Sequence, residues 1–249
     1  MTEKSKTTSG RSGGRAQRLI KRSAKPVINP CPPGQFGGMY KPLSQPDLEN
    51  IFDTALRLLS ELGMGEIPNR LRQDLLTAGA QDSEAGRVVF PRSLTEDAIA
   101  KAAKTFVLHG RDETRSIEVG GSKVYFGTGG AAVQTLDLDS GTYRPSTLAD
   151  LHNFTRLQDT LANVSWYTRC CVATDVPSNF DLDVNTAYAL LLNTTKPTAT
   201  SFTLAEYVAP IVKMLDIAAG GKGAFSKRPF MKAHISPVIS PMRYGEDAV

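Results

Sequence analysis

The hydrophobic positions of this chain follow one period near its front and another in its second half. Between Ser44 and Gly63 they recur every three to four residues, which predicts a helix that a capping serine begins and a glycine ends. The same spacing predicts two further helices over residues 68–78 and 91–104, with a short strand at 88–90 between them. We expect this front section to form a helical cap that precedes the main fold.

Short runs of alternating polar and hydrophobic residues follow the cap, separated by turns that contain glycine. Such runs are typical of β-strands, and here they predict one or two hairpins. The expected strands are residues 105–108, 116–119, 123–126 and 133–137.

From Thr147 onward, strand-like and helix-like segments alternate at about 30–35 residues per unit, which is typical of βαβ architecture with a parallel sheet. About four such units are present, whereas a closed TIM (β/α)8-type barrel uses eight. We therefore expect an incomplete α/β barrel, the N-terminal half of a larger one, with a complete doubly wound sheet as the alternative. The expected strands are 164–169, 198–202 and 230–235, and the expected helices are 147–161, 182–193 and 204–219. Residues 236–241 are expected to form a strand-to-helix loop before an acidic first turn at Glu246 and Asp247.

The basic charge of the chain lies at its N-terminus. Residues 1–25 hold eight Lys and Arg side chains against Glu3 alone, so the rest has a formal charge of −3 although the net charge is +4. Because this segment has almost no apolar residues, we expect a disordered tail. A nucleic-acid-binding arm is the alternative, but no basic helix or interleaved aromatic residues support it. The predicted division is a basic tail (1–25), a connector with the helical cap (26–110), and a hairpin region with the first half of the barrel (111–249).

Cysteine and histidine usage gives no metal motif. Cys170 and Cys171 are adjacent and would face opposite sides of a strand, so we interpret them as core residues. The three histidines show no ligand spacing. The chain shows neither the apolar core of a signal peptide nor a run long enough to span a membrane, and we expect a cytoplasmic protein without a membrane partner.

The stretch from Gly120 to Ser146 contains the motif Gly127-Thr128-Gly129-Gly130, which invites a phosphate-loop interpretation. That interpretation is weak, because the next segment continues as a strand and not as a helix. A hairpin turn whose glycines bring backbone close to a cavity is the better hypothesis, with Thr128 and Gly129 as pocket-lining candidates.

Ligands of α/β proteins bind at the carboxyl ends of parallel strands, which here are expected at residues 168–175, 201–202 and 234–236. Aromatic side chains on or beside these strands would attract a cation that lacks N–H donors, such as a quaternary ammonium group. Core packing is the alternative for each of them, as a structural role is for His234. The candidate substrate-binding residues are Tyr125, Phe126, Thr128, Gly129, Trp166, Phe202 and His234, with no catalytic residue and no metal ligand assigned.

Several runs taken together resemble the trimethylamine methyltransferase family over residues 26–249. They are PPGQFGGMYKPLS before the first helix, YFGTGGAAVQTLDLDSGTYRPSTLADL, NTTKPTATSF and HISPVISPM. The resemblance implies a TIM barrel and transfer of a methyl group from a methylamine or quaternary amine, such as trimethylamine or glycine betaine, to a corrinoid. The corrinoid (cobalamin) is then carried by a cognate partner protein and not bound directly. Some members of the family carry pyrrolysine later in the chain, beyond the residues present here.

Methyl transfer to Co(I) needs no protein nucleophile, since cobalt is the nucleophile. An active site without a catalytic triad or metal ligands is therefore expected, provided that it holds a cation and excludes water. The alternatives are a barrel-derived protein that binds a small cation without turnover, an inactive fragment, and a nucleic-acid-associated protein that uses the basic tail. A homo-oligomer is compatible with each of these.

Overall fold

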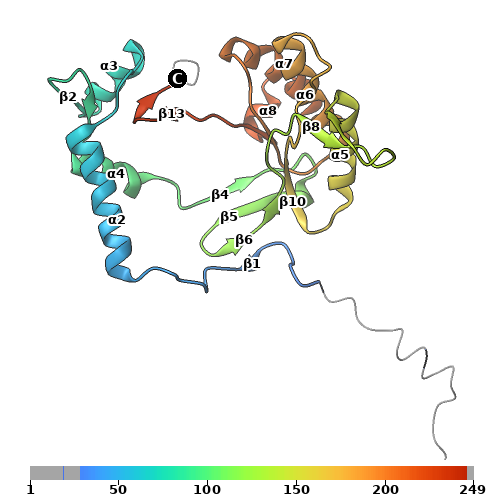
Figure 1. The fold of residues 1–249 in the computed structure, drawn as a ribbon, viewed down its shortest axis with the longest axis horizontal. Coiled ribbons are helices and arrows are strands. Elements are labelled where there is room, and N and C mark those ends of the chain that lie inside the picture. The colour runs from blue at the N-terminus through green and yellow to red at the C-terminus, as the bar shows by residue number, and fades with distance from the viewer. Residues whose placement is uncertain (1–18, 20–28, 246–249) are drawn as a thin grey trace, which may run out of the picture. The chain divides into compact units, whose positions relative to one another are not determined.

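The computed structural model describes Leu19 and residues 29–245 (Figure 1). From Pro33 onward the chain forms one compact unit. The predicted basic tail, apart from Leu19, and the acidic turn expected at Glu246 and Asp247 lie outside the described residues. Among the helices in the described part, none is long and apolar enough to cross a membrane.

The front helices form where the hydrophobic period predicts them. Helix α2 (Gln45–Arg57) begins with a capping box, in which Ser44 Oγ accepts the N–H of Asp47 at 3.3 Å and Asp47 Oδ2 accepts the N–H of Ser44 at 3.1 Å. It continues as a π-helical turn, η1 (Leu58–Leu62), and stops at Gly63, whose φ of 69° suits glycine. Helices α3 (Asn69–Thr77) and α4 (Arg92–Lys101) follow, with the antiparallel pair β2 (Gln81–Asp82) and β3 (Val88–Val89) between them.

Two antiparallel hairpins follow the cap. The first joins two predicted strands, and the second pairs the strand predicted at 133–137 with a strand that was not predicted, at residues 143–145. One joins β4 (Thr105–Leu108) to β5 (Ile117–Gly120) across the 3₁₀ turn η2 (Glu113–Arg115), and the other joins β8 (Gln134–Leu136) to β9 (Tyr143–Pro145).

The prediction of a single hairpin strand over residues 123–126 is wrong. The structure splits it into β6 (Lys123–Val124), which pairs antiparallel with β1 (Gln35–Phe36), and β7 (Phe126–Gly127), which pairs parallel with β10. Its two halves therefore belong to different sheets.

A four-stranded parallel sheet organises the second half of the chain. Its order is β12-β11-β10-β7, formed by Met231–Ala233, Thr198–Thr200, Val164–Thr168 and Phe126–Gly127. The connecting helices are α5 (Leu148–Thr160), α6 (Asn179–Asn193), α7 (Val208–Ala218) after the 3₁₀ turn η3 (Ala205–Tyr207), and the short α8 (Ala224–Lys227). The predicted mixed α/β class with a parallel sheet is confirmed; closure into a TIM barrel stays a prediction.

Strand alternation gives the sheet two different faces. One face packs against the helices, and there Tyr167 is fully buried in the main hydrophobic core, whose other members include Leu151, Leu190, Ile211 and Met231. The opposite face carries Trp166 and Lys232, whose ammonium Nζ lies 4.9 Å from the centre of the indole ring. The main hydrophobic core therefore covers one face of the sheet, and the face with Trp166 and Lys232 is available for contacts with other parts of the molecule or with a ligand.

Residues 236–241 do not form the expected strand-to-helix loop. They lead into a short hairpin of β13 (Val238–Ile239) and β14 (Arg243–Tyr244), with a cis peptide bond between Ser240 and Pro241. The hairpin is held against the front section, where Gly65 N–H donates to Met242 O at 2.9 Å and Tyr244 N–H donates to Gly65 O at 3.1 Å. These hydrogen-bonded residues are far apart in the sequence, so the local pattern of hydrophobic and polar residues did not predict their contact.

A network of charged side chains fixes the β8–β9 hairpin to helix α5. Arg144 donates from both terminal nitrogens to the carboxylate of Asp150, at 2.7 and 2.9 Å, and from Nε to Asp137 at 3.2 Å. Asp150 is also the capping-box partner of Thr147 and is only 8% exposed. The Arg144 guanidinium holds the pKa of Asp150 well below its ordinary value, against the opposing effect of burial.

Replacing Asp150 by asparagine is expected to lower the free energy of unfolding by about 2 kcal/mol at neutral pH, because the ion pair and half of the cap are lost. The pKa of Asp150 is lower in the folded chain than in the unfolded one, so its stabilisation is present above about pH 4 and is lost as pH falls below that value. Urea denaturation from pH 7 down to acid should therefore show the difference between wild type and Asp150→Asn shrinking. Asp139→Asn, in the exposed turn, is the control and should differ little at any pH. A gap that stays constant down to acid pH would contradict this role.

Candidate functional site

The carboxyl ends of the four parallel strands bring together polar residues from distant parts of the sequence. Thr128 and Gly129 follow β7, Arg169 follows β10, Ser201 follows β11 and His234 follows β12. In a parallel sheet these positions share one edge, which is where α/β proteins bind ligands. We call this group of five residues the carboxyl-edge cluster.

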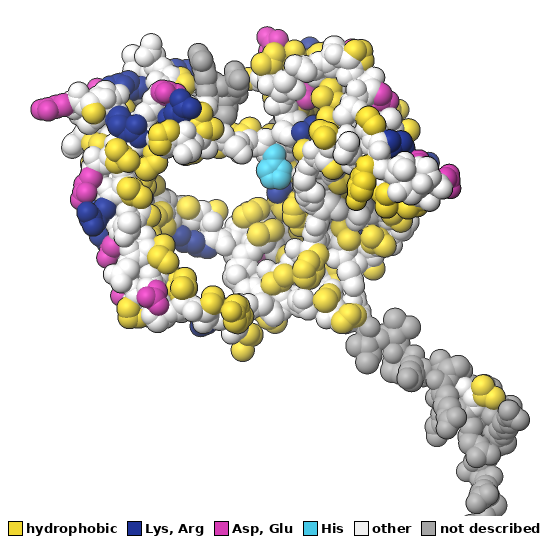
Figure 2. All heavy atoms as spheres, in the orientation of Figure 1, with side chains coloured by type: hydrophobic (Ala, Val, Ile, Leu, Met, Phe, Trp, Pro, Cys, Tyr) yellow, Lys and Arg dark blue, Asp and Glu magenta, His cyan; other side chains and the backbone are white. Residues whose placement is uncertain are grey.

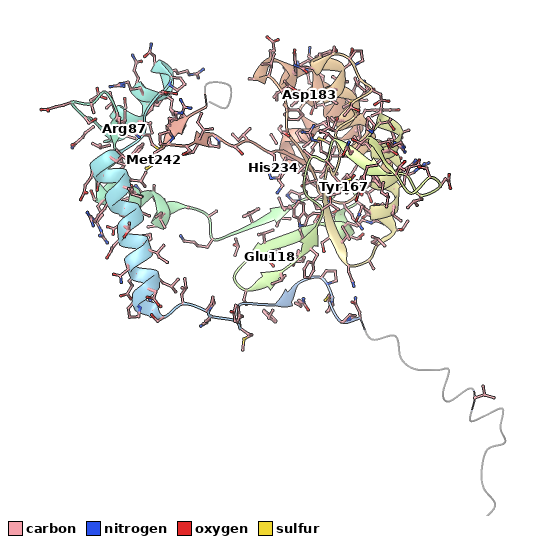
Figure 3. The ribbon with its side chains drawn as sticks, in the orientation of Figure 1. Arg87, Glu118, Tyr167, Asp183, His234 and Met242 are labelled. Atoms are coloured by element: carbon pink, nitrogen blue, oxygen red, sulfur yellow. The ribbon has the colours of Figure 1, made fainter. Side chains whose placement is uncertain are left out.

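His234 is held by its backbone and leaves its side chain exposed. Its N–H donates to Thr200 O at 2.8 Å, continuing the ladder beyond β12. A histidine stands on the surface in Figure 2, at the place where Figure 3 labels His234. The side chain is therefore accessible to a ligand that approaches this edge.

The Thr128 hydroxyl fastens the loop after β7 to the neighbouring strand. Its Oγ1 donates to Thr168 O at 2.6 Å and accepts the Thr168 N–H at 3.0 Å, as a strand backbone would. The predicted pocket-lining role thus competes with a structural one at Thr128. Gly129, in contrast, has no atom within 4 Å of the place where a Cβ would stand, so it faces open space.

Trp166 lies deeper than the edge, on the face of the sheet opposite the helices. A Cβ added at Gly127 would stand 2.1 Å from the Trp166 ring, so the ring packs directly on the glycine backbone. Lys232 lies over the ring, and cavities of about 110 and 380 Å³ adjoin both side chains. The cation that Trp166 contacts in this structure is therefore a residue of the same chain.

Arg169 was not singled out from the sequence, although its position one residue after a strand is the signal that would have found it. Its Nη2 donates to Ser201 Oγ at 3.0 Å, across the ends of β10 and β11. Among the described residues Arg169 forms no ion pair with a carboxylate. The carboxyl-edge cluster therefore carries a guanidinium whose charge is not neutralised by a contacting acid of the described chain.

The remaining predicted residues are not gathered at this edge. Tyr125 precedes β7 and lines a cavity at the amino ends of the strands. Phe126 is half-exposed on β7, and Phe202 packs against the main core, which is the structural alternative considered for it. The four aromatic candidates therefore do not form a single cage in the described part of the chain.

The adjacent cysteines lie at the end of β10. Cys171 is 2% exposed in the main core, which confirms the structural interpretation for it, and Cys170 is half-buried with its sulfur 3.3 Å from the Tyr167 hydroxyl oxygen. Hydrogen bonds with Cys171 and Tyr167 lower the pKa of the Cys170 thiol, whereas burial raises the pKa of Tyr167. Over the described ranges, no three His, Cys, Asp or Glu side chains are placed to hold a metal ion.

Chemically, the carboxyl-edge cluster offers a cationic guanidinium, two hydroxyl groups, an imidazole and unobstructed backbone at Gly129. Such an arrangement binds and orients a polar ligand more readily than it attacks one, because no hydroxyl or thiol in the cluster contacts a general base among the described residues.

Comparisons with known proteins agree with this picture. Residues 11–249 match the trimethylamine methyltransferase (MTTB) family. A curated relative, the trimethylamine methyltransferase MttB of Desulfitobacterium hafniense, is 28% identical over 202 residues, which cover 80% of this chain and 40% of that protein. The chain thus spans less than half the length of this relative. Because the family match takes in nearly the whole sequence, the chain belongs to the trimethylamine methyltransferase family.

Proposed function

We propose that this chain carries part of the active site of an enzyme that moves a methyl group from a methylated amine to the Co(I) corrinoid of a partner protein. Family membership supports the methyltransferase class, and the carboxyl-edge cluster supplies a place for the amine. The parallel sheet then represents the first half of a TIM barrel, whose active sites lie at the carboxyl ends of the strands.

When the corrinoid of the partner is docked, its Co(I) supplies the nucleophile, and the amine leaves with the electrons of the broken carbon–nitrogen bond. The contribution of this chain is to hold the amine, to orient one methyl group and to keep water away. The open space at Gly129 and the exposed His234 leave the edge accessible to a large acceptor.

The observation that carries the substrate assignment is the guanidinium of Arg169. A quaternary ammonium group alone is repelled by a nearby guanidinium, whereas a carboxylate is attracted and bound by paired N–H groups. Ser201 Oγ accepts a hydrogen bond from Arg169, so its own proton is free to be donated to the same carboxylate. The cluster therefore favours a zwitterionic amine of the glycine betaine type, with its carboxylate on Arg169 and its methyl groups directed away.

Arg169→Met is expected to weaken glycine betaine binding by about 10- to 100-fold, because a charged hydrogen-bonded contact is lost. Binding of tetramethylammonium, which has no carboxylate, should stay the same or become tighter. Isothermal titration of both ligands against the purified chain measures the difference. Arg156→Met, which removes an exposed arginine from α5, is the matched control and should change neither affinity. Equal weakening of both ligands, or of neither, would contradict the assignment.

Transfer itself is measured by the spectral change of Co(I) cobalamin when glycine betaine or trimethylamine is added. We expect the methylated spectrum to form with glycine betaine and to form more slowly with Arg169→Met. Saturable betaine binding without any spectral change would instead support a protein that binds a small cation without turnover.

A further inference from the structure

A second polar cavity lies at the opposite edge of the sheet from the carboxyl-edge cluster. It has a volume of about 450 Å³, which is within the range of small-molecule sites. Its walls come from the segments that enter the parallel strands: Tyr125 before β7, Ser165 at the start of β10 and Lys196 before β11. Arg115 at the end of η2 and Asp159 near the end of α5 complete the polar lining.

The charges around this cavity leave one excess positive charge. Arg115 forms an ion pair with Asp159, whose carboxylate also accepts the hydroxyl of Thr194 at 2.7 Å. Lys196 is 7% exposed and donates to two backbone carbonyls, Gln158 O at 2.7 Å and Leu161 O at 2.8 Å. These carbonyls stabilise its position at the end of α5 but do not neutralise its charge. Burial accordingly lowers the pKa of Lys196.

Ser165 supplies an independent sign that a ligand belongs here. Its side chain is 8% exposed, and its Oγ has no hydrogen-bond partner in the described chain. A buried hydroxyl without a partner destabilises a fold, so one that persists in a cavity calls for an explanation. Ser165 lines the same cavity as Lys196, so an acceptor placed between them would satisfy both.

We propose that this amino-edge cavity binds a small oxyanion, the carboxylate or phosphate group of a small molecule, between Ser165, Lys196, Arg115 and the Tyr125 hydroxyl. Each of these side chains is a hydrogen-bond donor, and Lys196 and Arg115 carry positive charge. An oxyanion neutralises the excess charge and accepts the hydroxyl proton of Ser165. The site is separate from the methyl-transfer site, because it lies at the other ends of the same strands.

Ser165→Ala is the most direct test, because it removes only the hydroxyl and leaves both cations in place. The probes are inorganic phosphate and acetate, titrated into the purified chain at constant ionic strength. We expect at least one of them to bind saturably and its affinity to fall about 10-fold in Ser165→Ala. The two probes distinguish a phosphate from a carboxylate ligand.

Two controls separate binding in the cavity from other effects. Ser122→Ala, at an exposed serine, should leave the affinity unchanged. Lys196→Met should abolish binding while Lys213→Met, at an exposed lysine of α7, should not, and far-UV circular dichroism shows whether Lys196→Met still folds. Absence of saturable binding of both probes, or binding that Ser165→Ala leaves unchanged, overturns the proposal.

Discussion

Replacing Gly127 by alanine is expected to lower the free energy of unfolding by about 3 kcal/mol, because the new methyl group overlaps a rigid ring. The Cβ would stand 2.1 to 2.4 Å from three atoms of the Trp166 indole. The ring cannot simply swing away, because Lys232 lies over it and the sheet backbone fixes its Cα. Urea denaturation followed by the fluorescence of Trp166, the single tryptophan of the chain, reports both the stability and the displacement of the ring.

Gly129→Ala is the matched control for this prediction. Gly129 lies two residues beyond Gly127, in the segment that follows β7. Its φ is outside the left-handed region, and no atom lies within 4 Å of its added Cβ. We expect its stability to stay within about 0.5 kcal/mol of the wild type. If both substitutions destabilise the chain to the same extent, packing of Trp166 on Gly127 is not the cause.

Replacing Arg87 by methionine is expected to have a comparable effect, about 3 kcal/mol, because one guanidinium joins two distant segments. Its Nε donates to Leu62 O at 2.9 Å, and its Nη2 donates to Gly63 O and Met242 O, both at 2.8 Å. Arg87 and Met242 lie close together in Figure 3. Without the guanidinium, three carbonyls lose a charged donor, and the β13–β14 hairpin loses a main attachment to the front section.

Limited proteolysis measures that detachment, because the exposed residues 234–236 lead into the hairpin. We expect cleavage there to be faster in Arg87→Met, and Arg87→Lys to recover only part of the protection because lysine lacks the fork. Arg57→Met removes a solvent-exposed i,i+4 ion pair with Glu61 and should change little. Cleavage at the wild-type rate in Arg87→Met would contradict the role assigned to Arg87.

Local sequence signals predicted much of this fold. The capping serine at Ser44, the cap expected at Ser146 or Thr147, the glycine at position 63 and the hydrophobic period together placed helices α2 and α5 within a few residues of their observed ends. The β4 and β10 strands were found in the same way. The helices depend on contacts between residues near each other in the chain. The strands were recognised from their local residue pattern, although β10 pairs with β7 and β11, which are distant in the sequence.

Pairing between distant segments was not predictable in this way. The short run at 123–126 reads as one strand, but its halves pair with β1 and with β10, about 90 and 40 residues away along the chain. Residues 236–241 were predicted as a strand-to-helix loop, because the residues that stabilise their hairpin, Gly65 and Arg87, lie in a distant segment. Glu66 and Met242, which lie at this contact, both have a positive φ. Their residue types do not predict this backbone conformation.

The candidate site was predicted in part for the same reason. His234 was proposed because strand ends are local features. Thr128 and Gly129 were proposed as part of a hairpin turn, whereas the structure places them after β7, which pairs parallel with β10. Aromatic residue type does not reveal which face or end of a strand a ring occupies. Tyr125, Trp166 and Phe202 were therefore grouped, although Tyr125 and Trp166 line a common cavity whereas Phe202 packs against the main core. Arg169 was not singled out because an arginine that follows a strand but belongs to no motif is a weak signal.

The contact between Arg87 and Met242 also has a consequence for biosynthesis. The two residues are 155 positions apart, so the contact cannot form until residue 242 has left the ribosome. The helices of the front section depend on local contacts and can form well before that. During translation the carbonyls of Leu62 and Gly63 already have the Arg87 guanidinium, while the N–H of Gly65 must bond to water until Met242 is made. Docking of the β13–β14 hairpin therefore follows formation of the front helices, and it replaces that water with a partner from a segment that is synthesised much later.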